Sequence, residues 1–311
     1  MSIERIRRNI TQSNNMFNTN GVPRESSGAS IDIQPVEYRS SDNSIICFLQ
    51  GGMGNQMFQY ALGKNLSLKY DVPLKLNISR FDLCGMRQYS LGLWSGVNEP
   101  IVNEKSIVIK ENGIPYDEST FNSIVPGTSF VGYWQSEKYF FNIKKELQDI
   151  FLPKKELTER GSSTLKKILE AGDKSVFLTV RRSDYVNSNF HNVLSKDYYD
   201  KALSIVEQDV KDPVIFIFSD EPEWCKTNMK LPYKTIVSGN YDITTKTHLG
   251  REDEELFLMM NCKHAILANS SYSWWGAWLN KNPGIRVAPL KWFENDNGGS
   301  RDIVSSDWIR I

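Results

Sequence analysis

Hydrophobic and polar positions divide the chain into two series of alternating strands and helices. In the first series, IICFLQ (45–50) is a short apolar run ended by glycines, which predicts a buried strand. A helix is predicted over 55–70 and a second strand over 72–77. Apolar positions on one face of that helix are Met57, Tyr60, Ala61 and Leu68. Strand, glycine turn, helix and strand form a βαβ unit, which implies a parallel sheet.

The second series begins after a polar, helix-prone stretch at 154–169. Its predicted strands are 176–180, 214–218 and 265–269, and its predicted helices are 197–208, 251–263 and 270–280. The stretch 81–150 is rich in aromatic residues and shows no clear period. We therefore predict an α/β protein of two Rossmann-like domains facing each other across a cleft. The expected domain limits are 44–155 and 156–311.

Residues 1–43 differ from both series because they are rich in Asn, Ser and Arg and poor in large apolar side chains. Such a segment cannot bury enough surface to order itself, so we predict a mobile tail. Ile3, Ile6 and Ile10 lie on one side of a short basic helix, which allows at most peripheral contact with an anionic membrane.

Composition excludes several classes of function. The 37 basic and 37 acidic residues balance, so no global field attracts nucleic acid. Four separated cysteines and three histidines give no zinc spacing, and we predict that Cys47 and Cys225 are buried free thiols. No stretch approaches the roughly 18 apolar residues of a membrane span. The N-terminus also lacks the apolar region of a signal peptide, which leads us to expect a cytoplasmic protein.

Two arginines, Arg181 and Arg182, directly follow the predicted strand 176–180. Burying unpaired charge is very costly, so they are unsuited to a core. The planar guanidinium fork matches phosphate oxygens, and the carboxyl end of a parallel strand is where ligands bind in such sheets. Consecutive side chains point opposite ways, so one arginine is free for a ligand while the other braces the loop against Asp184. A salt-bridge loop without a ligand remains the alternative.

A glycine-rich loop, LQGGMGNQ (49–56), follows the first predicted strand. Gly51, Gly52 and Gly54 let the backbone approach a ligand, and the helix that opens there presents free N–H groups. The spacing matches neither the dinucleotide fingerprint nor a Walker A loop. Asn55 and Gln56 favour a binding loop over a plain tight turn.

Polar residues also follow two strands of the second series. Asn269, Ser270, Ser271 and Tyr272 lie between a strand and a helix, where serines either cap the helix or bind a phosphate. The tryptophans that follow have helical spacing, which favours packing. Asp220 precedes Pro222 at a helix start; it either caps that helix or accepts hydrogen bonds from a nucleoside.

In this order, GGMGNQMFQYALG, TVRRSDY, SDEPEW and CKHAILANSSYSWWGAWLN resemble the family-11 glycosyltransferases, the α-1,2-fucosyltransferases. The match runs from about residue 45 to 294. It implies a GT-B fold, GDP-fucose as donor and a galactose-containing oligosaccharide or lipid-linked glycan as acceptor, in O-antigen synthesis. It also implies inversion at the sugar carbon, and no metal or other cofactor. The oligomeric state is not predicted.

The resemblance also assigns tasks to the residues named above. Arg181 and Arg182 would contact the donor diphosphate, Asp220 would lie near the nucleoside, and Ser270, Ser271 and Tyr272 would line the donor pocket. Asn55 and the 51–54 loop would face the reacting centre. In a metal-free reaction, fixed positive charge must stabilise the leaving GDP. Asp184 is the nearest motif carboxylate for the acceptor proton, although bracing an arginine is its expected task.

One departure from the family pattern concerns Thr179, because a histidine usually begins the tandem-arginine motif. Ser183 likewise stands where glycine is common. The change puts donor affinity in question more than donor identity. Two alternatives remain open: a transferase for another nucleotide sugar, and a non-catalytic sensor that binds the donor without transfer.

Overall fold

The protein was analysed as a computed structural model that describes residues 43–84, 87–103, 106–186, 188, 190–238, 241–242, 247–248, 250–295 and 298–311. The predicted tail at 1–43 lies outside this part except for Asn43. The N-terminal lobe, from Asn43 through α5 (Lys144–Ile150), contains a four-stranded sheet of order β2-β1-β4-β3. Its strands are β1 (Ile45–Phe48), β2 (Leu74–Asn77), β3 (Ile107–Lys110) and β4 (Thr128–Val131), and every pairing is parallel.

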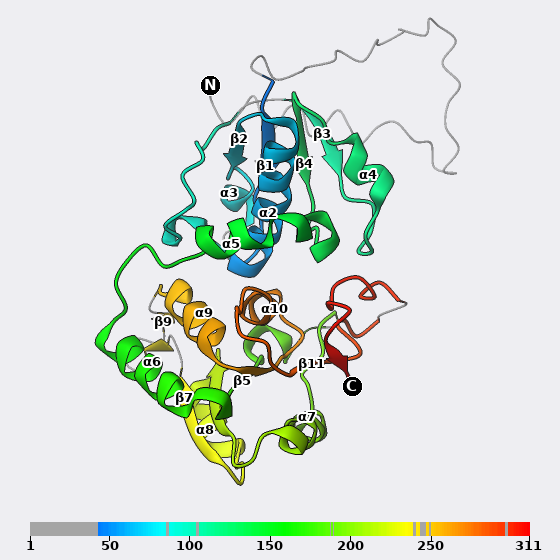
Figure 1. The fold of residues 1–311 in the computed structure, drawn as a ribbon. Coiled ribbons are helices and arrows are strands. Elements are labelled where there is room, and N and C mark those ends of the chain that lie inside the picture. Colours follow the sequence, from blue (N-terminus) through cyan, green and yellow to red (C-terminus); the bar gives the residue numbers. More distant parts are fainter. Residues whose placement is uncertain are drawn as a thin grey trace, which may run out of the picture. The chain divides into compact units, whose positions relative to one another are not determined.

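Helix α2 (Met53–Tyr70) lies beside this sheet (Figure 1) and is the longest helix of the described residues. It is buried on most sides from Met53 to Leu66 because both the sheet and the second lobe cover it. Leu68 lies eleven residues after Met57, about three helical turns, and so on the same face, but it is half exposed in the last turn of α2. The shorter helices are α3 (Phe81–Cys84) and α4 (Glu118–Ser123).

The C-terminal lobe, from α6 (Glu159–Ala171) onward, contains a six-stranded parallel sheet of order β12-β11-β10-β5-β6-β7. The central strands read as unbroken apolar runs because parallel strands are covered on both faces. The strands are β5 (Ser175–Val180), β6 (Val214–Ser219), β7 (Lys234–Ser238), β10 (His264–Ile266), β11 (Arg286–Ala288) and β12 (Ile309–Arg310). The helices are α7 (Lys196–Asp209), α8 (Pro222–Asn228), α9 (Glu252–Asn261) and α10 (Ser271–Trp278). A separate two-stranded ladder pairs β8 (Tyr241–Asp242) with β9 (Thr247–His248).

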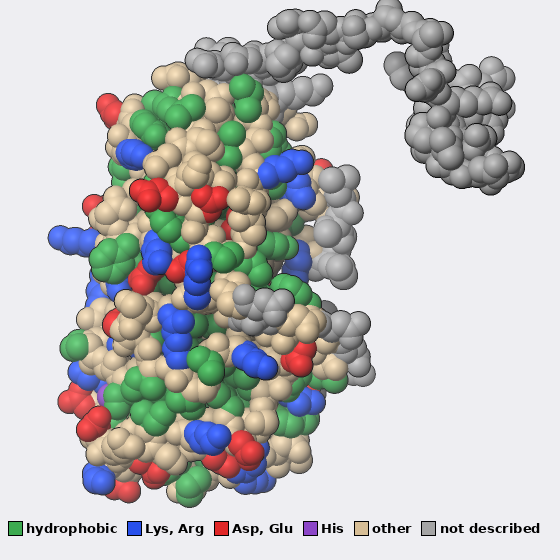
Figure 2. Space-filling view, turned by 90° about the vertical axis from the view of Figure 1, so that its right-hand side faces the viewer, with side chains coloured by type: hydrophobic (Ala, Val, Ile, Leu, Met, Phe, Trp, Pro, Cys, Tyr) green, Lys and Arg blue, Asp and Glu red, His purple; other side chains and the backbone are tan. Residues whose placement is uncertain are grey.

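Two parallel sheets, each with its own helices, confirm the predicted α/β class and the GT-B arrangement of two Rossmann-like lobes. The predicted boundary near residue 155 falls between α5 and α6, although the domain limits themselves stay a prediction. Cys47 and Cys225 are buried and free, as predicted. No helix of the described residues is both long and apolar enough to cross a membrane. Basic, acidic and hydrophobic side chains intermingle on the face shown in Figure 2.

Helices α2 and α10 bring the lobes into contact through buried aromatic rings. The Phe58 ring of α2 lies 4.5 Å from that of Trp274 and 4.9 Å from that of Trp275, between ring centroids. The Trp275 indole N–H donates to the Gly54 carbonyl at 2.9 Å. Trp274, Trp275 and Trp278 are almost fully buried, which confirms that these tryptophans pack. We call this contact the aromatic joint.

Candidate active site

Arg181 and Arg182 leave the carboxyl end of β5 and lead into a short 3-10 turn at Ser183–Tyr185. The Arg181 guanidinium pairs with Asp184 at 2.6 Å and with Asp220, which follows β6, at 2.9 Å. The expected bracing of an arginine against Asp184 is therefore present. The side chain of Asp220 is only 4% exposed. Arg181 is thus the group that compensates a nearly buried carboxylate.

Arg182 points to other partners than Arg181. Its Nε donates to the Glu221 carboxylate at 3.0 Å, and its guanidinium carbon lies 3.8 Å from the ring centroid of Trp224. Its backbone N–H donates to Asp220 at 3.1 Å. Asp220 is therefore not the N-cap of α8, which is Glu221. It instead holds the Arg182 backbone and the Arg181 side chain, within residues 181–185, which we call the arginine turn.

A third arginine, Arg87, reaches this site from the N-terminal lobe and was missed by sequence reasoning. Its guanidinium pairs with Asp184 at 3.1 Å, so Asp184 is shared between Arg87 and Arg181. Three guanidinium groups thus face three carboxylates, those of Asp184, Asp220 and Glu221. Arg87 and Asp184 are 97 residues apart, so no local pattern predicts that they pair. The one signal in the sequence is that Arg87 lies in a polar stretch.

Tyr185 connects the arginine turn to the loop that follows. Its ring lies under Arg181, 5.2 Å from the guanidinium carbon, and stacks on His191 with 4.2 Å between ring centroids. Burial is the main cause that raises the pKa of Tyr185 to about 12. Burial also lowers the pKa of His191 from its ordinary value, against the attraction of Asp184. His191 is therefore neutral at pH 7.

The glycine loop lies directly against the start of α10. A Cβ atom on Gly54 would come within 2.5 Å of the Tyr272 amide nitrogen and 2.8 Å of the Ser271 hydroxyl. Gly51 has φ +77°, which favours glycine, and its missing side chain leaves room for the Asn55 amide. The structure thus brings together the two predicted motifs 51–54 and 270–272, from different lobes.

The two amides after the glycines have different surroundings. Gln56 is fully buried: its nitrogen donates to the carbonyls of Gly51 and Gln88, and its oxygen accepts from the Ser90 N–H. Its side chain therefore shapes the loop. Asn55 is partly exposed and accepts a hydrogen bond from Gln135 at 2.7 Å. Donor contact by either amide stays a prediction.

The residues before α10 also divide into two kinds. Ser270 is the N-cap residue, but its side chain makes no capping hydrogen bond, and Ser270 and Ser271 are both partly exposed. The Tyr272 hydroxyl donates to the carbonyl of Glu252 in α9. Asn269 is buried, and its amide nitrogen donates to Asn192 and to the Trp292 carbonyl at 3.0 Å. The Asn269 side chain therefore ties two loops together.

Thr179, two residues before Arg181, lies inside the sheet and is 5% exposed. Its hydroxyl accepts a hydrogen bond from the Ala268 N–H at 2.7 Å, beyond the end of β10. The hydroxyl thus holds β5 beside the loop of Ser270 and Ser271, which we call the Ser-Ser turn. Thr179 therefore stabilises the base of the site.

A metal site would need several ligating side chains in one place. Among the residues that the structure describes, no group of three or more His, Cys, Asp or Glu side chains could hold a metal ion. The absence of a required cofactor nevertheless stays a prediction. The chemistry that the site offers is fixed positive charge, hydroxyls and backbone N–H groups at the ends of parallel strands.

Comparison with known proteins places these motifs in context. The model of the family described as "Glycosyl transferase family 11" matches residues 117–311. The chain is 31% identical to an "Alpha-1,2-colitosyltransferase" of Escherichia coli, over 86% of this chain and 98% of the relative. It is 28% identical to the "O-antigen biosynthesis glycosyltransferase WbnK" of Escherichia coli, over 85% and 99%. A solved NodZ alpha-1,6-fucosyltransferase soaked with GDP-fucose is 11% identical, with a TM-score of 0.44, over 76% of this chain and 92% of that one.

Proposed function

Because the chain belongs to glycosyl transferase family 11, we propose that it transfers L-fucose from GDP-fucose to the 2-hydroxyl of a terminal galactose-type sugar. The reaction inverts the sugar carbon and forms an α-1,2 linkage in O-antigen synthesis. The observation that carries the proposal is the position of Arg181 and Arg182. They stand at the carboxyl end of β5, which is distant from Ser270 and Ser271 in sequence but pairs directly with β10, the strand that precedes these serines.

The leaving GDP needs positive charge where the glycosidic bond breaks. Arg181 and Arg182 supply this charge, and their geometry is fixed before the donor arrives because carboxylates already orient them. Asp184 is the partner that yields most readily to a diphosphate, since its side chain is 52% exposed. Asp220 stays in place because it is nearly buried and also holds the backbone of Arg182.

Bracing remains the better role for Asp184 than proton transfer. Its two oxygens are each engaged with one arginine, Arg181 and Arg87. If the transition state resembles an oxocarbenium ion, a strong base is dispensable, and the charge on the β-phosphate is the main requirement. The arginines therefore carry the proposed chemistry.

A second candidate differs only in the sugar. The "Alpha-1,2-colitosyltransferase" is 31% identical to this chain, which favours colitose, a fucose lacking the 3-hydroxyl, as the alternative donor sugar. Nothing in the arginine site distinguishes the two sugars, because it contacts the diphosphate. The donor pocket beside Ser270 and Ser271 would make that distinction.

A donor panel tests the proposal. The full chain is incubated with GDP-fucose, GDP-colitose or UDP-galactose and with lactose as acceptor, and GDP or UDP release and the product linkage are measured. We expect an α-1,2-fucosyl product from GDP-fucose, at the same rate in EDTA. If a product forms only from GDP-colitose, the donor sugar is colitose and not fucose. Loss of activity in EDTA with recovery in manganese would contradict the metal-free mechanism, and GDP binding without transfer or hydrolysis would identify a sensor.

A further inference from the structure

A cavity of about 360 Å³ opens near the arginine turn and is not used by the chemistry described above. Its volume lies within the roughly 300 to 1,000 Å³ that is usual for small-ligand sites. Segments of both lobes form its walls. The residues that matter for its chemistry are Ile114, Pro115, Phe190, Phe293, Asn295 and Arg301.

The walls combine exposed aromatic surface with a charged side chain. Phe190 is 52% exposed although it packs on Phe293, with 4.5 Å between ring centroids. The Glu294 N–H donates to the Phe190 carbonyl at 2.9 Å, so the two rings are held side by side. The Arg301 side chain is 69% exposed. Apolar rings with a few convergent donors are the usual lining of a pocket for a polar organic ligand.

The cavity is connected to the arginine turn by a row of stacked rings. Phe293 lies 5.7 Å from His191, which stacks on Tyr185, which in turn lies under Arg181. In addition, the Nδ1 atom of His191 is buried and has no hydrogen-bond partner among the described residues. The row of rings thus links the cavity wall at Phe293 to the arginine turn.

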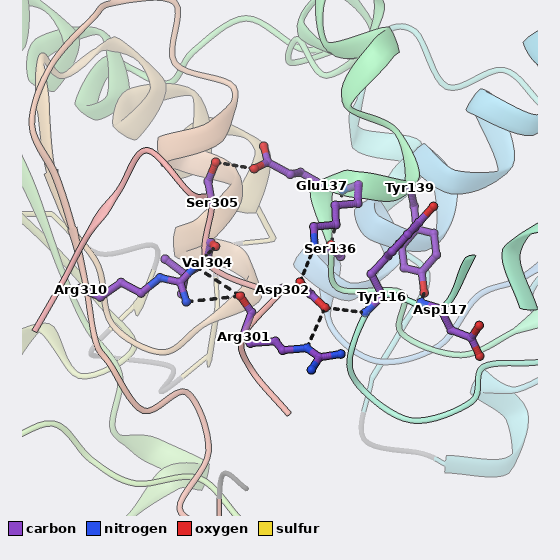
Figure 3. A network of polar contacts seen from close by, with 11 residues as sticks. Tyr116, Asp117, Ser136, Glu137, Tyr139, Arg301, Asp302, Val304, Ser305 and Arg310 are labelled. Carbon is purple, nitrogen blue, oxygen red and sulfur yellow. Dashed lines mark hydrogen bonds and ion pairs between the residues drawn. The ribbon is translucent and has the colours of Figure 1, made fainter. Parts of the chain in front are cut away.

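A polar network, drawn in Figure 3, holds the two walls together. Asp302, next to Arg301, accepts hydrogen bonds from the Tyr116 N–H at 3.0 Å and from Lys138 at 2.6 Å. Burial would raise the pKa of Asp302, but the hydrogen bonds from Lys138 and Tyr116 lower it overall, so its charge is kept. The segment of Ile114 and Pro115 is thereby held next to the segment that carries Arg301.

We propose that this cavity binds the acceptor glycan, with a galactoside ring lying against Phe190 and Phe293 and its hydroxyls bonded by Arg301. The inference rests on the proposed function and adds the place of its second substrate. A sugar ring has an apolar face that fits an aromatic surface and hydroxyls that match guanidinium donors. The cavity meets both needs, and the row of rings leads from it to the donor arginines.

Two exposed substitutions test the cavity without threatening the core: Phe190→Ala and Arg301→Ala. Their matched controls are Phe141→Ala, at a phenylalanine that is 60% exposed and outside the cavity, and Arg80→Ala, at an exposed arginine of the N-terminal lobe. We expect the KM for lactose to rise about tenfold in each cavity variant, as loss of a ring contact or of charged donors predicts. The KM for GDP-fucose, the affinity for GDP and the rate of acceptor-free donor hydrolysis should stay unchanged, and the controls should match the wild type.

Binding measured without turnover separates this inference from the proposed function. In saturation-transfer NMR, methyl β-galactoside should receive magnetisation from the wild type and from Phe141→Ala, and much less from Phe190→Ala. Equal signals in all variants, or no signal in the wild type, would overturn the acceptor site. An unchanged lactose KM in both cavity variants would overturn it as well, even with fucosyl transfer intact. Failure to bind GDP would instead refute the proposed function. The galactoside signal would still show whether the cavity binds a galactoside.

Discussion

Two of the contacts between the lobes differ in kind. In the aromatic joint, Phe58 of one lobe packs among Trp274 and Trp275 of the other, and all three are fully buried. At the arginine turn, Arg87 reaches Asp184 across the lobes with both side chains about half exposed. The joint depends on close packing, which tolerates little change of volume. The arginine contact depends on charge in water, which is worth at most about 1 kcal/mol and is screened by salt.

Because of this difference, the aromatic joint sets the positions of the loops, and the arginine turn offers groups that can bind an anion. A packed joint sets where the glycine loop stands relative to the Ser-Ser turn, because the Trp275 indole is bonded to the Gly54 carbonyl. A solvated ion pair can exchange one anion for another, because Asp184 and a phosphate compete for the same donors. We therefore expect a ligand to enter the arginine turn without a change in the aromatic joint. Substitutions in the two regions should affect different measurements.

The largest effect is expected from Arg182→Ala, which should lower kcat by roughly 10²- to 10³-fold, as loss of one donor to developing charge does. Stability should change by no more than about 1 kcal/mol, because the partner Glu221 is 32% exposed and stays hydrated. Steady-state GDP release and urea unfolding measure the two quantities, with Arg80→Ala as the control. A near-normal kcat would remove Arg182 from the mechanism. Arg181→Ala is less clean, since it leaves the nearly buried Asp220 without its guanidinium.

The aromatic joint should respond in the opposite way. Trp275→Phe removes part of a fully buried ring and leaves the Gly54 carbonyl without its indole donor. We expect a loss of about 2 to 3 kcal/mol in the free energy of unfolding. At a temperature where the variant is folded, its kcat should stay within a few-fold of the wild type. Urea unfolding followed by circular dichroism gives the first value; a kcat loss matching that of Arg182→Ala would erase the distinction between the regions.

Local patterns predicted the elements that are buried on both sides. Strands β5 and β6 read as apolar runs because neighbours cover both faces, and α10 showed its tryptophans at helical spacing. Edge strand β3 was missed because its side chains alternate between partly buried and exposed. The same local reading found Arg181 and Arg182, since adjacent charges after an apolar strand are conspicuous.

Partners that are distant in sequence could not be predicted in this way. The pairing of Arg87 with Asp184 spans 97 residues, and that of Asn269 with Asn192 spans 77. No period in the chain encodes such contacts, because they arise from how two lobes and several loops meet. Sequence reasoning therefore could not show that the Asn269 amide nitrogen joins two loops, and donor binding by Asn269 stays a prediction. The cavity near Phe293 has the same origin.

A single methyl group on the glycine loop tests whether the two regions are coupled. In Gly54→Ala, the new Cβ would stand 2.5 Å from the Tyr272 nitrogen, a backbone atom that cannot turn aside. The starts of α2 and α10 must separate, which we expect to cost about 1 to 3 kcal/mol of stability. Because Ser271 moves with α10, the KM for GDP-fucose should rise as well. Thermal unfolding and donor kinetics measure both effects on one variant.

Gly52→Ala is the matched control for this coupling. Gly52 has φ −75° and would place its Cβ with nothing within 4 Å, so alanine fits without strain. Its stability should equal or slightly exceed that of the wild type. If Gly54→Ala and Gly52→Ala lower stability equally, flexibility of the glycine loop matters and contact with α10 does not. If only Gly54→Ala lowers stability and also raises the KM for GDP-fucose, then packing between the lobes controls donor binding. The aromatic joint would then set the position in which the arginine turn meets the donor.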